Sequence, residues 1–157
     1  MTTAAELAQP GALELLTHAT LTRLSYVDSA GYPRVLPIGF WWDGAAIVVC
    51  TATTAPKVAA IRARPKVGLV IDEGDTPATA RALMLRGTAE VEIVDGVPDE
   101  FIAASTKRLS GADADQYAAI ARQTYPAMAR IRIPVEWARF YDFGAGRLPQ
   151  FLSQLAG

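Results

Sequence analysis

The chain has 157 residues with a formal net charge of −1, and 51% of its residues are hydrophobic. A chain of this size and apolar content forms one domain with a real core, which excludes intrinsic disorder. The low charge without runs of Lys or Arg excludes an electrostatic nucleic-acid binder, and no apolar run reaches the roughly 20 residues of a membrane-spanning helix.

The cysteine and histidine content excludes further classes of protein. The chain has one cysteine, Cys50, and one histidine, His18, which do not provide the ligand set of a zinc or other transition-metal site. A lone cysteine forms no internal disulfide and fits a reducing compartment. The start of the chain is acidic rather than basic, unlike a secretory signal peptide. We therefore expect a single cytoplasmic domain over residues 1–157.

The first predicted elements are a short helix and a strand. Leu13 and Leu16 follow Pro10 at helical spacing, which predicts a helix over residues 10–18. The Thr-rich, β-branched segment over residues 20–27 predicts a first strand, and DSAGYP predicts the turn that follows it.

The second predicted strand, residues 35–42, is apolar on both faces. Both faces should therefore be covered, one by the core and the other by a subunit, a helix or a ligand. Pro37 cannot donate to a ladder, so it indicates an edge or a bulge, and Gly39 leaves room for a close approach to the backbone. A buried strand that is bent by Pro37 and Gly39 explains the same pattern.

Residues 45–71 predict a strand, a polar turn, a short helix and another strand. Hydroxyl groups and one ammonium gather where this helix begins: Thr51, Thr53, Thr54 and Lys57. Together with the free N–H groups of a helix start, they have the chemistry of a phosphate site. An ordinary helix start, with Thr53 or Thr54 as its cap and Lys57 in solvent, fits the spacing slightly better.

The second half of the chain adds strands and an insertion. The patterns predict a long strand over residues 82–94, a helical insertion over about 98–124, a last strand over 129–142 and a tail over 144–157. Arg86, on the polar face of the long strand, could meet an anion or pair with Glu90. Six strands with hairpin turns and one crossover helix predict a mainly β protein with inserted helices, built as a six-stranded antiparallel barrel.

No constellation of acid–base or nucleophilic residues is visible. Cys50 ends an apolar strand and His18 lies in a different element, so neither a thiol nor a serine nucleophile has a base beside it. No catalytic residue and no metal ligand is assigned. If the chain is an enzyme, its chemistry resides in a bound cofactor.

The order of these motifs resembles the pyridoxamine 5′-phosphate oxidase-like split-barrel family, which includes flavin- and deazaflavin-dependent oxidoreductases. The matching segments are LTRLSYVDSAGYPRVLPIGFWWDG, VVCTATTAPKVAAIRARPKVGLVID, LMLRGTAEVEIVD and IPVEWARFYDFG, which cover most of residues 18–144. The resemblance implies a split β-barrel homodimer with the cofactor in the groove between the subunits.

The resemblance also implies the site residues. They are Lys57, Thr51, Thr53 and Thr54 for the phosphate of the cofactor, and Pro37, Ile38 and Gly39 for its tricyclic ring, with Arg86 as a further candidate. Many family members have another basic residue just before the lysine, where this chain has Ala55-Pro56. The cofactor is therefore FMN or the deazaflavin coenzyme F-420, which the sequence does not separate.

The implied function is hydride transfer to or from a small organic substrate. The alternative is a non-catalytic carrier or sensor of flavin, haem or another ligand. The residues that recognise pyridoxal phosphate in the true oxidase are not evident, so vitamin B6 oxidation is not expected.

Overall fold

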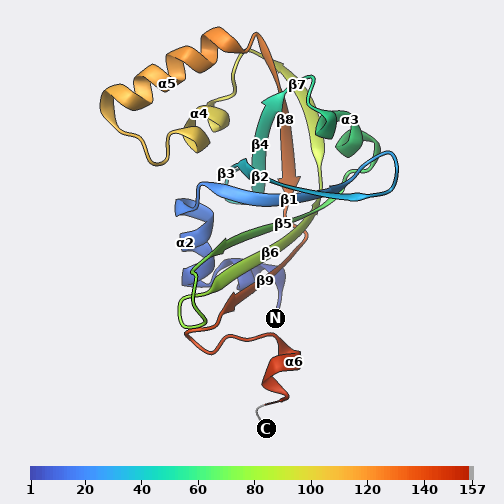
Figure 1. Cartoon of the computed structure of the whole chain (residues 1–157), viewed down its shortest axis with the longest axis vertical. Coiled ribbons are helices and arrows are strands. Elements are labelled where there is room, and N and C mark those ends of the chain that lie inside the picture. Colours follow the sequence, from blue (N-terminus) through green and yellow to red (C-terminus); the bar gives the residue numbers. More distant parts are fainter. Residues whose placement is uncertain (156–157) are drawn as a thin grey trace.

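The computed structural model describes residues 1–155 and shows two antiparallel sheets flanked by helices (Figure 1). The strands are β1 (Leu21–Val27), β2 (Pro33–Gly39), β3 (Trp41–Trp42), β4 (Ala46–Ala52), β5 (Lys66–Glu73), β6 (Arg81–Thr88), β7 (Glu90–Asp95), β8 (Ala127–Pro134) and β9 (Trp137–Asp142). The helices are α1 (Thr3–Leu7), α2 (Pro10–His18), α3 (Pro56–Ala63), α4 (Asp99–Ser105), α5 (Gly111–Thr124) and α6 (Gln150–Ser153). The protein is therefore mainly β with several helices.

The two sheets cross each other to enclose the core. One has the strand order β2-β1-β5-β6-β9 and the other the order β3-β4-β8-β7. In Figure 1, β1 and β2 run across the view, whereas β4 and β8 run along it. The arrangement is an open antiparallel barrel, in which strands that bend from one sheet into the other form the corners.

The expected number of six strands is wrong, because three predicted strands bend and each is divided between the sheets. The strand predicted over residues 35–42 is β2 followed by β3, that over 82–94 is β6 followed by β7, and that over 129–142 is β8 followed by β9. The described residues therefore contain nine strands. Over residues 82–94 apolar and polar residues keep alternating through the bend, and residues 35–42 are apolar throughout, so in neither strand does the pattern reveal where the chain changes sheets.

A glycine allows two of these bends to meet. A Cβ atom at Gly87, near the end of β6, would lie 2.2 Å from the carbonyl oxygen of Pro134 at the end of β8. The backbone N–H of Glu136, between β8 and β9, donates to the carbonyl of Arg86 at 2.9 Å. This contact joins residues that are far apart in the sequence, which local periodicity cannot predict.

The core lies mainly between the sheets, and α2 covers one side of it. The largest fully buried side chains are Leu15, Leu16, Leu24, Phe40, Ile47, Ile61, Ile71, Leu83, Leu85, Met128, Ile131 and Ile133. The helix predicted over residues 10–18 is α2, whose buried face is formed by Ala12, Leu15 and Leu16. Their spacing of three and four residues places them on one side of the helix.

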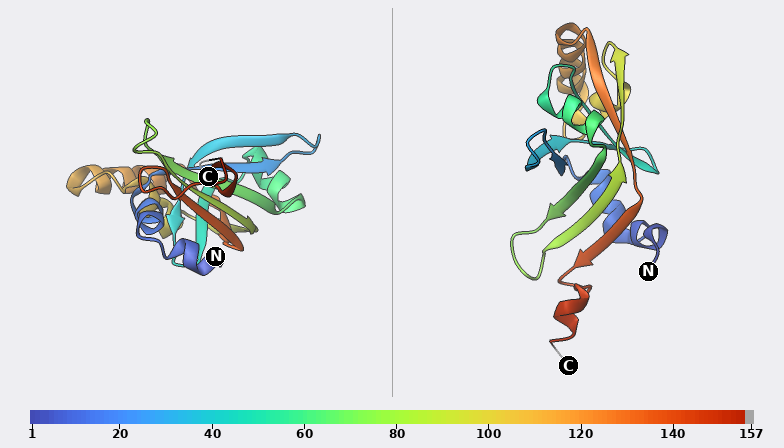
Figure 2. Two further views of the ribbon diagram at one scale, coloured as in Figure 1. Left: turned by 90° about the horizontal axis from the view of Figure 1, so that it is seen from below. Right: turned by 90° about the vertical axis from the view of Figure 1, so that its right-hand side faces the viewer.

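The helical insertion lies at one end of the molecule and the C-terminal segment at the other (Figure 2). Helix α4 packs on β4 through Phe101, and an ion pair of 2.5 Å between Glu100 and Arg130 joins it to β8. Lys107, which follows α4, donates to the carbonyl of Ala19 at 2.8 Å and so ties the insertion to the end of α2. Burial lowers the pKa of Lys107 to about 8.

Part of the predicted tail over residues 144–157 is described. It forms a glycine turn and then α6, none of whose residues is buried. Residues 156 and 157 lie outside the described residues. Among residues 1–155, no helix combines the length and the apolar character that crossing a membrane requires.

Candidate functional site

The turn between β4 and α3 begins the candidate site. Strand β4 ends at Ala52, and the backbone N–H of Ala55 donates to the carbonyl of Ala52 at 3.1 Å, which reverses the chain. Pro56 then lies in the first turn of α3, where its missing N–H costs nothing. Ala55 is the N-cap residue, and no side chain caps this helix. The alternative in which Thr53 or Thr54 caps α3 is therefore wrong, and the start of α3 presents its positive end without a capping side chain.

The structure brings Lys57 and Thr51 together beside this helix start. Nζ of Lys57 donates to Oγ1 of Thr51 at 3.4 Å, and both residues are half-buried. Burial lowers the pKa of Lys57. No ion pair to Lys57 forms within residues 1–155, so its charge lies in a partly desolvated position without a carboxylate partner. Such a position favours an anionic ligand.

The other two predicted phosphate ligands lie close in the chain. Thr53 and Thr54 are exposed in the turn before α3, and neither side chain has a hydrogen-bond partner in the described part of the chain. Of the three threonines, only Thr51 contacts Lys57, whereas the hydroxyl groups of Thr53 and Thr54 face solvent. Their assignment as phosphate ligands stays a prediction.

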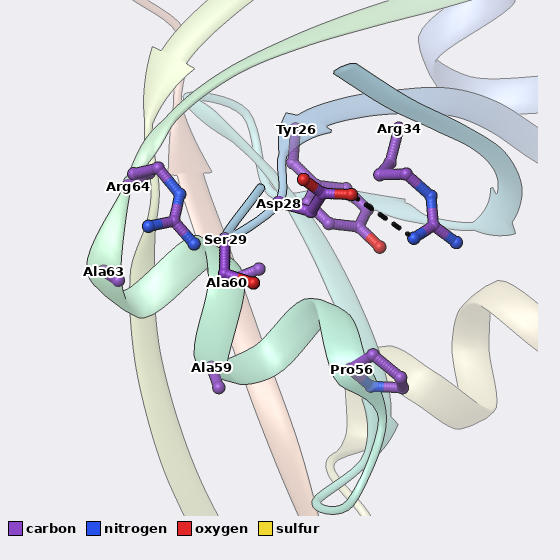
Figure 3. Close-up of a pocket in the computed structure, with 9 residues that line it drawn as sticks. All are labelled: Tyr26, Asp28, Ser29, Arg34, Pro56, Ala59, Ala60, Ala63 and Arg64. Atoms are coloured by element: carbon purple, nitrogen blue, oxygen red, sulfur yellow. Dashed lines mark ion pairs between the residues drawn. The ribbon is translucent and has the colours of Figure 1, made fainter. Parts of the chain in front are cut away.

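A cleft of about 490 Å³ continues along α3 and is bounded on its other side by β1, β2 and the turn that joins them (Figure 3). Its lining residues are Tyr26, Asp28, Ser29, Arg34, Pro56, Ala59, Ala60, Ala63 and Arg64. Small side chains of α3 form one wall. Two guanidinium groups, Arg34 and Arg64, give the cleft a net positive charge, since Asp28 is its only acidic lining residue.

Arg34, Arg64 and Asp28 were not predicted from the sequence as site residues. The hairpin register pairs Tyr26 of β1 with Arg34 of β2, which places both side chains on the face toward α3. Counting back from the DSAGYP turn gives this register, so the signal for Arg34 was present in the sequence. The position of Arg64 depends on how α3 packs on the hairpin, which the sequence does not show.

Asp28 is held by its own turn. Its Oδ1 accepts hydrogen bonds from the backbone N–H groups of Ala30 and Tyr32, both at 3.0 Å. The hydrogen bond from Tyr32 is the main reason that the pKa of Asp28 is lowered. Its Oδ2 lies 3.6 Å from Arg34. The carboxylate therefore shapes the turn and orients Arg34.

The predicted ring-binding segment is divided between two faces of the sheet. Pro37 is exposed on the outer face of β2, and β2 is an edge strand, as proline at this position indicates. Ile38 and Gly39 line a second, smaller cavity of about 100 Å³. The rest of its lining comes from β4 and the insertion: Val48, Cys50, Glu100, Phe101, Ala104 and Ser105.

Arg86 lies apart from the start of α3. Its guanidinium carbon is 4.2 Å from the centre of the Trp137 ring, on the outer face of the five-stranded sheet. Within the described residues no ion pair links Arg86 to Glu90, so that alternative is wrong. Among residues 1–155 of the single chain, Arg86 and Lys57 make no direct contact.

The outer face of this sheet is open in the single chain. Val35 is 67% exposed and Met84 is 38% exposed, and both lie on this face with Arg86 and Trp137. The expectation that both faces of the second strand are covered is therefore not met within one chain.

Nucleophilic or metal chemistry has no support in the described residues. Burial, reinforced by the charge of Glu100, raises the pKa of Cys50 to about 12, so its thiol stays protonated. In residues 1–155, His, Cys, Asp and Glu side chains form no group of three that could hold a metal ion.

Two crossed antiparallel sheets that share bent strands define the fold of the chain as a split barrel. The family model for pyridoxamine 5′-phosphate oxidase matches residues 9–142, and the chain belongs to this family. The family predicted from the sequence is confirmed. No curated protein sequence matches the chain.

Solved structures of the same fold include proteins of different kinds. A conserved hypothetical protein from Mycobacterium tuberculosis has a TM-score of 0.69 and 17% identity, with 96% of this chain and 94% of that one covered. An F-420 reductase has a TM-score of 0.58 and 22% identity, with coverages of 83% and 98%. HutZ, the heme storage protein from Vibrio cholerae, has a TM-score of 0.58 and 19% identity, with coverages of 88% and 94%. At these identities the likeness shows the fold alone.

Proposed function

We propose that this protein is a flavin- or deazaflavin-dependent oxidoreductase that transfers a hydride to or from a small organic substrate. The observation that carries the proposal is the start of α3, where a half-buried Lys57 contacts Thr51 beside a helix terminus that no side chain caps. The F-420 reductase of the same fold shows that this architecture serves such enzymes.

The chemistry of the donors fits the phosphate of FMN or of coenzyme F-420. Lys57 supplies a positive charge without an acidic partner, and Thr51, Thr53 and Thr54 supply hydroxyl donors. The segment from Pro37 to Gly39 would border the ring. When bound, the cofactor supplies the ring that accepts or gives the hydride. The chain itself binds the cofactor, fixes its orientation and keeps water from its ring.

The absence of a reactive side chain agrees with this division of roles. The thiol of Cys50 is kept protonated by burial, and no other nucleophile–base pair was found in the sequence. Free Cys50 is also compatible with the cytoplasmic location that we propose. The protein residues therefore need only position the reactants.

We also propose that the protein is a homodimer joined through the outer face of the five-stranded sheet. This face exposes Val35 and Met84 beside the exposed Pro37, and β2 is an edge strand of the sheet. A second copy would remove this apolar surface from water. The proposal assigns Arg86 and Trp137 to the interface, which would explain why Arg86 lies far from Lys57 along one chain.

The second candidate function is a non-catalytic carrier or sensor of flavin, haem or another ligand. The likeness to the heme storage protein HutZ favours it, because the same fold there stores a ligand. Both functions require the protein to bind its ligand, but only the oxidoreductase converts a substrate.

One experiment separates these functions. Purified protein is titrated with FMN, coenzyme F-420 and haem, and the reduced cofactor complex is then mixed with small unsaturated or planar acceptors while cofactor oxidation is followed. We expect micromolar binding of FMN or F-420 and acceptor-dependent oxidation. Binding without oxidation would establish the carrier, and haem binding alone would exclude both cofactor assignments.

A further inference from the structure

The smaller cavity lies where the helical insertion meets the barrel. Figure 1 shows α4 beside β3 and β4, and one side of this helix lines the cavity: Glu100, Phe101, Ala104 and Ser105. Their spacing in the chain places them on a single helix face. The other lining residues come from β2 and β4: Ile38, Gly39, Val48 and Cys50. The cavity therefore lies directly beside the segment that we assign to the cofactor ring.

The volume of this cavity limits what it can hold. An apolar cavity of about 150 Å³ in another protein binds one benzene molecule. By proportion, a cavity of about 100 Å³ accommodates about four non-hydrogen atoms. The three fused rings of a flavin or deazaflavin do not fit into it. A small part of a substrate that lies against the ring does.

Glu100 gives the cavity a hydrogen-bond acceptor. Its Oε1 accepts both hydrogen bonds from Arg130, at 2.9 and 2.5 Å, and no other side chain within residues 1–155 donates to this carboxylate. The hydrogen bond from Arg130 is the main reason that the pKa of Glu100 is lowered, so the carboxyl stays ionised. Its Oε2 can therefore accept a hydrogen bond from a ligand.

The charges around the cavity favour a neutral ligand. Arg130 balances the charge of Glu100, so the pair has no net charge to attract a cation. An anionic group would lie beside the Glu100 carboxylate and be repelled. The thiol of Cys50 is protonated, because burial raises its pKa to about 12, and the hydroxyl of Ser105 can donate or accept. A neutral group with an N–H or O–H donor fits these partners.

The wall formed by α4 is held in place, so the cavity is preformed. Nζ of Lys107, just after α4, lies 3.9 Å from the centre of the Phe40 ring and donates to the carbonyl of Ala19 at 2.8 Å. Phe40 is fully buried and follows Gly39 in the chain. The insertion is thus fixed to the core next to the cavity, and the cavity can bind a ligand without first closing around it.

We propose that this cavity is a substrate pocket that binds a compact, neutral group with a hydrogen-bond donor, such as a carboxamide or a hydroxymethyl group, with Glu100 as the acceptor. This inference rests on the proposed function, because it places part of the substrate beside the cofactor ring. A carboxamide also offers its carbonyl oxygen to the hydroxyl of Ser105. Substrates with a carboxylate at this position should be rejected.

Three small probes of equal size test the pocket without cofactor or turnover. Acetamide has a donor, acetone has only an acceptor and acetate has a negative charge, and all three have the same number of non-hydrogen atoms. The readout is Kd from the NMR shifts of the amide groups of Gly39 and Ala104. We expect a millimolar Kd for acetamide, because so few atoms make contact. Acetone should bind about fivefold more weakly, and acetate more than about tenfold more weakly.

Substitutions locate the binding in the cavity. Ala104→Leu fills the cavity and should abolish the shift at Gly39, whereas the smaller change Ala104→Val should weaken acetamide binding and serves as the test if Ala104→Leu does not fold. Ala103→Leu is the matched control, because Ala103 lies on the same helix but does not line the cavity. Glu100→Gln should reduce the preference for acetamide over acetate to less than about threefold, because it removes the charge that repels acetate.

The complex with FMN or coenzyme F-420 links the cavity to the substrate. Acetamide should shift the absorption or fluorescence of the bound cofactor, because Ile38 and Gly39 line the cavity and border the ring. Ala104→Leu should remove this spectral shift. Ala103→Leu should retain it.

The outcomes distinguish this inference from the function on which it rests. If the cofactor binds but acetamide does not, or if acetamide and acetate bind equally, the pocket is overturned and the oxidoreductase stands. Equal effects of Ala103→Leu and Ala104→Leu would also overturn it. Acetamide that binds without changing the cofactor spectrum would exclude the role in substrate binding. If neither FMN nor coenzyme F-420 binds, the proposed function fails, and the substrate role of the cavity fails with it.

Discussion

Nη2 of Arg147 donates to the carboxylate of Glu6 at 2.6 Å, and together these two residues hold both backbone groups of Phe140. The N–H of Phe140 donates to Oε2 of Glu6 at 2.8 Å, and Nε of Arg147 donates to the carbonyl of Phe140 at 2.8 Å. Phe140 lies in β9, at the edge of the five-stranded sheet. Side chains from α1 and from the C-terminal turn thus take the place of a neighbouring strand, which protects this edge from pairing.

The Glu6–Arg147 pair should contribute strongly to stability, because the Glu6 side chain is only 5% exposed. Glu6→Gln should lower the free energy of unfolding by about 2–3 kcal/mol, since it weakens two charge-assisted hydrogen bonds. Urea denaturation measures the change. The control is Glu14→Gln, whose side chain is 56% exposed and should cost less than about 1 kcal/mol. Equal effects of the two substitutions would contradict this role.

The same carboxyl makes stability depend on pH. Burial tends to raise the pKa of Glu6, but hydrogen bonds from Phe140 and Arg147 outweigh it, so the pKa is lowered from its ordinary value of 4.5. A lowered pKa gives stability that is present above pH 4.5 and is lost as the pH falls through the pKa of the folded state. The stability difference between the unmodified protein and Glu6→Gln should therefore shrink as the solution is acidified below that value. Urea midpoints across the acid range test this, and a constant difference would argue against it.

Lys57 is the residue on which cofactor binding should depend most. Lys57→Ala should weaken binding of FMN or coenzyme F-420 by about 1.5–3 kcal/mol, because it removes a charge-assisted bond. Kd values from calorimetry check this. Lys66→Ala is the control, because Lys66 is exposed at the start of β5 and lies outside the turn and helix start that hold Thr51 and Lys57. Unchanged affinity in Lys57→Ala would exclude Lys57 as a ligand of the cofactor phosphate.

Gly87 should tolerate no side chain. Gly87→Ala places a Cβ atom 2.2 Å from the carbonyl oxygen of Pro134, so the two bent strands must move apart. We expect a loss of about 1–3 kcal/mol in the free energy of unfolding, the usual cost of overpacking. A Cβ atom at Gly68 would lie 3.9 Å from the nearest atom, the carbonyl oxygen of Leu85, which is an ordinary van der Waals distance. Gly68→Ala is therefore the control. Thermal and urea unfolding of both variants would show whether the close approach matters.

The proposed dimer makes a separate prediction. Val35→Glu places a charge on the outer face of the five-stranded sheet and should convert the dimer to a monomer, because burying an unpaired charge is costly. Ile120→Glu on α5 is the control, since Ile120 is 54% exposed but lies on the insertion. Light scattering after size exclusion measures the mass. A monomeric unmodified protein, or a dimer that persists in Val35→Glu, would exclude this interface.

Local patterns predicted the elements better than their pairing. The bounds of α2, the proline in the first turn of α3 and the edge position of β2 all follow from residues next to one another in the chain. A bend at Pro37 and Gly39 was one of two explanations of the apolar second strand, whereas the bends near Gly87 and Pro134 were missed, because only contacts across the barrel show where those strands leave their sheets.

The candidate site likewise has one part that local sequence predicts and another that depends on tertiary packing. Thr51 and Lys57 lie six residues apart, so their contact could be expected from a strand followed by a helix. Arg34 and Arg64 face one cleft only because α3 packs on the β1–β2 hairpin, a tertiary contact without a local signal. The capping role considered for Thr53 or Thr54 was wrong, because the turn after Ala52 makes Ala55 the N-cap residue.

The strands that bend between the sheets have a consequence for how the protein unfolds. Each of the pairs β2–β3, β6–β7 and β8–β9 is a nearly continuous stretch of chain with one part in each sheet. Neither sheet can lose its hydrogen bonds while the other stays intact, since opening one pulls on residues of the other. The barrel should therefore melt as one cooperative unit, with amide protons of both sheets exchanging at the same global rate, whereas those of α5 and α6 exchange earlier.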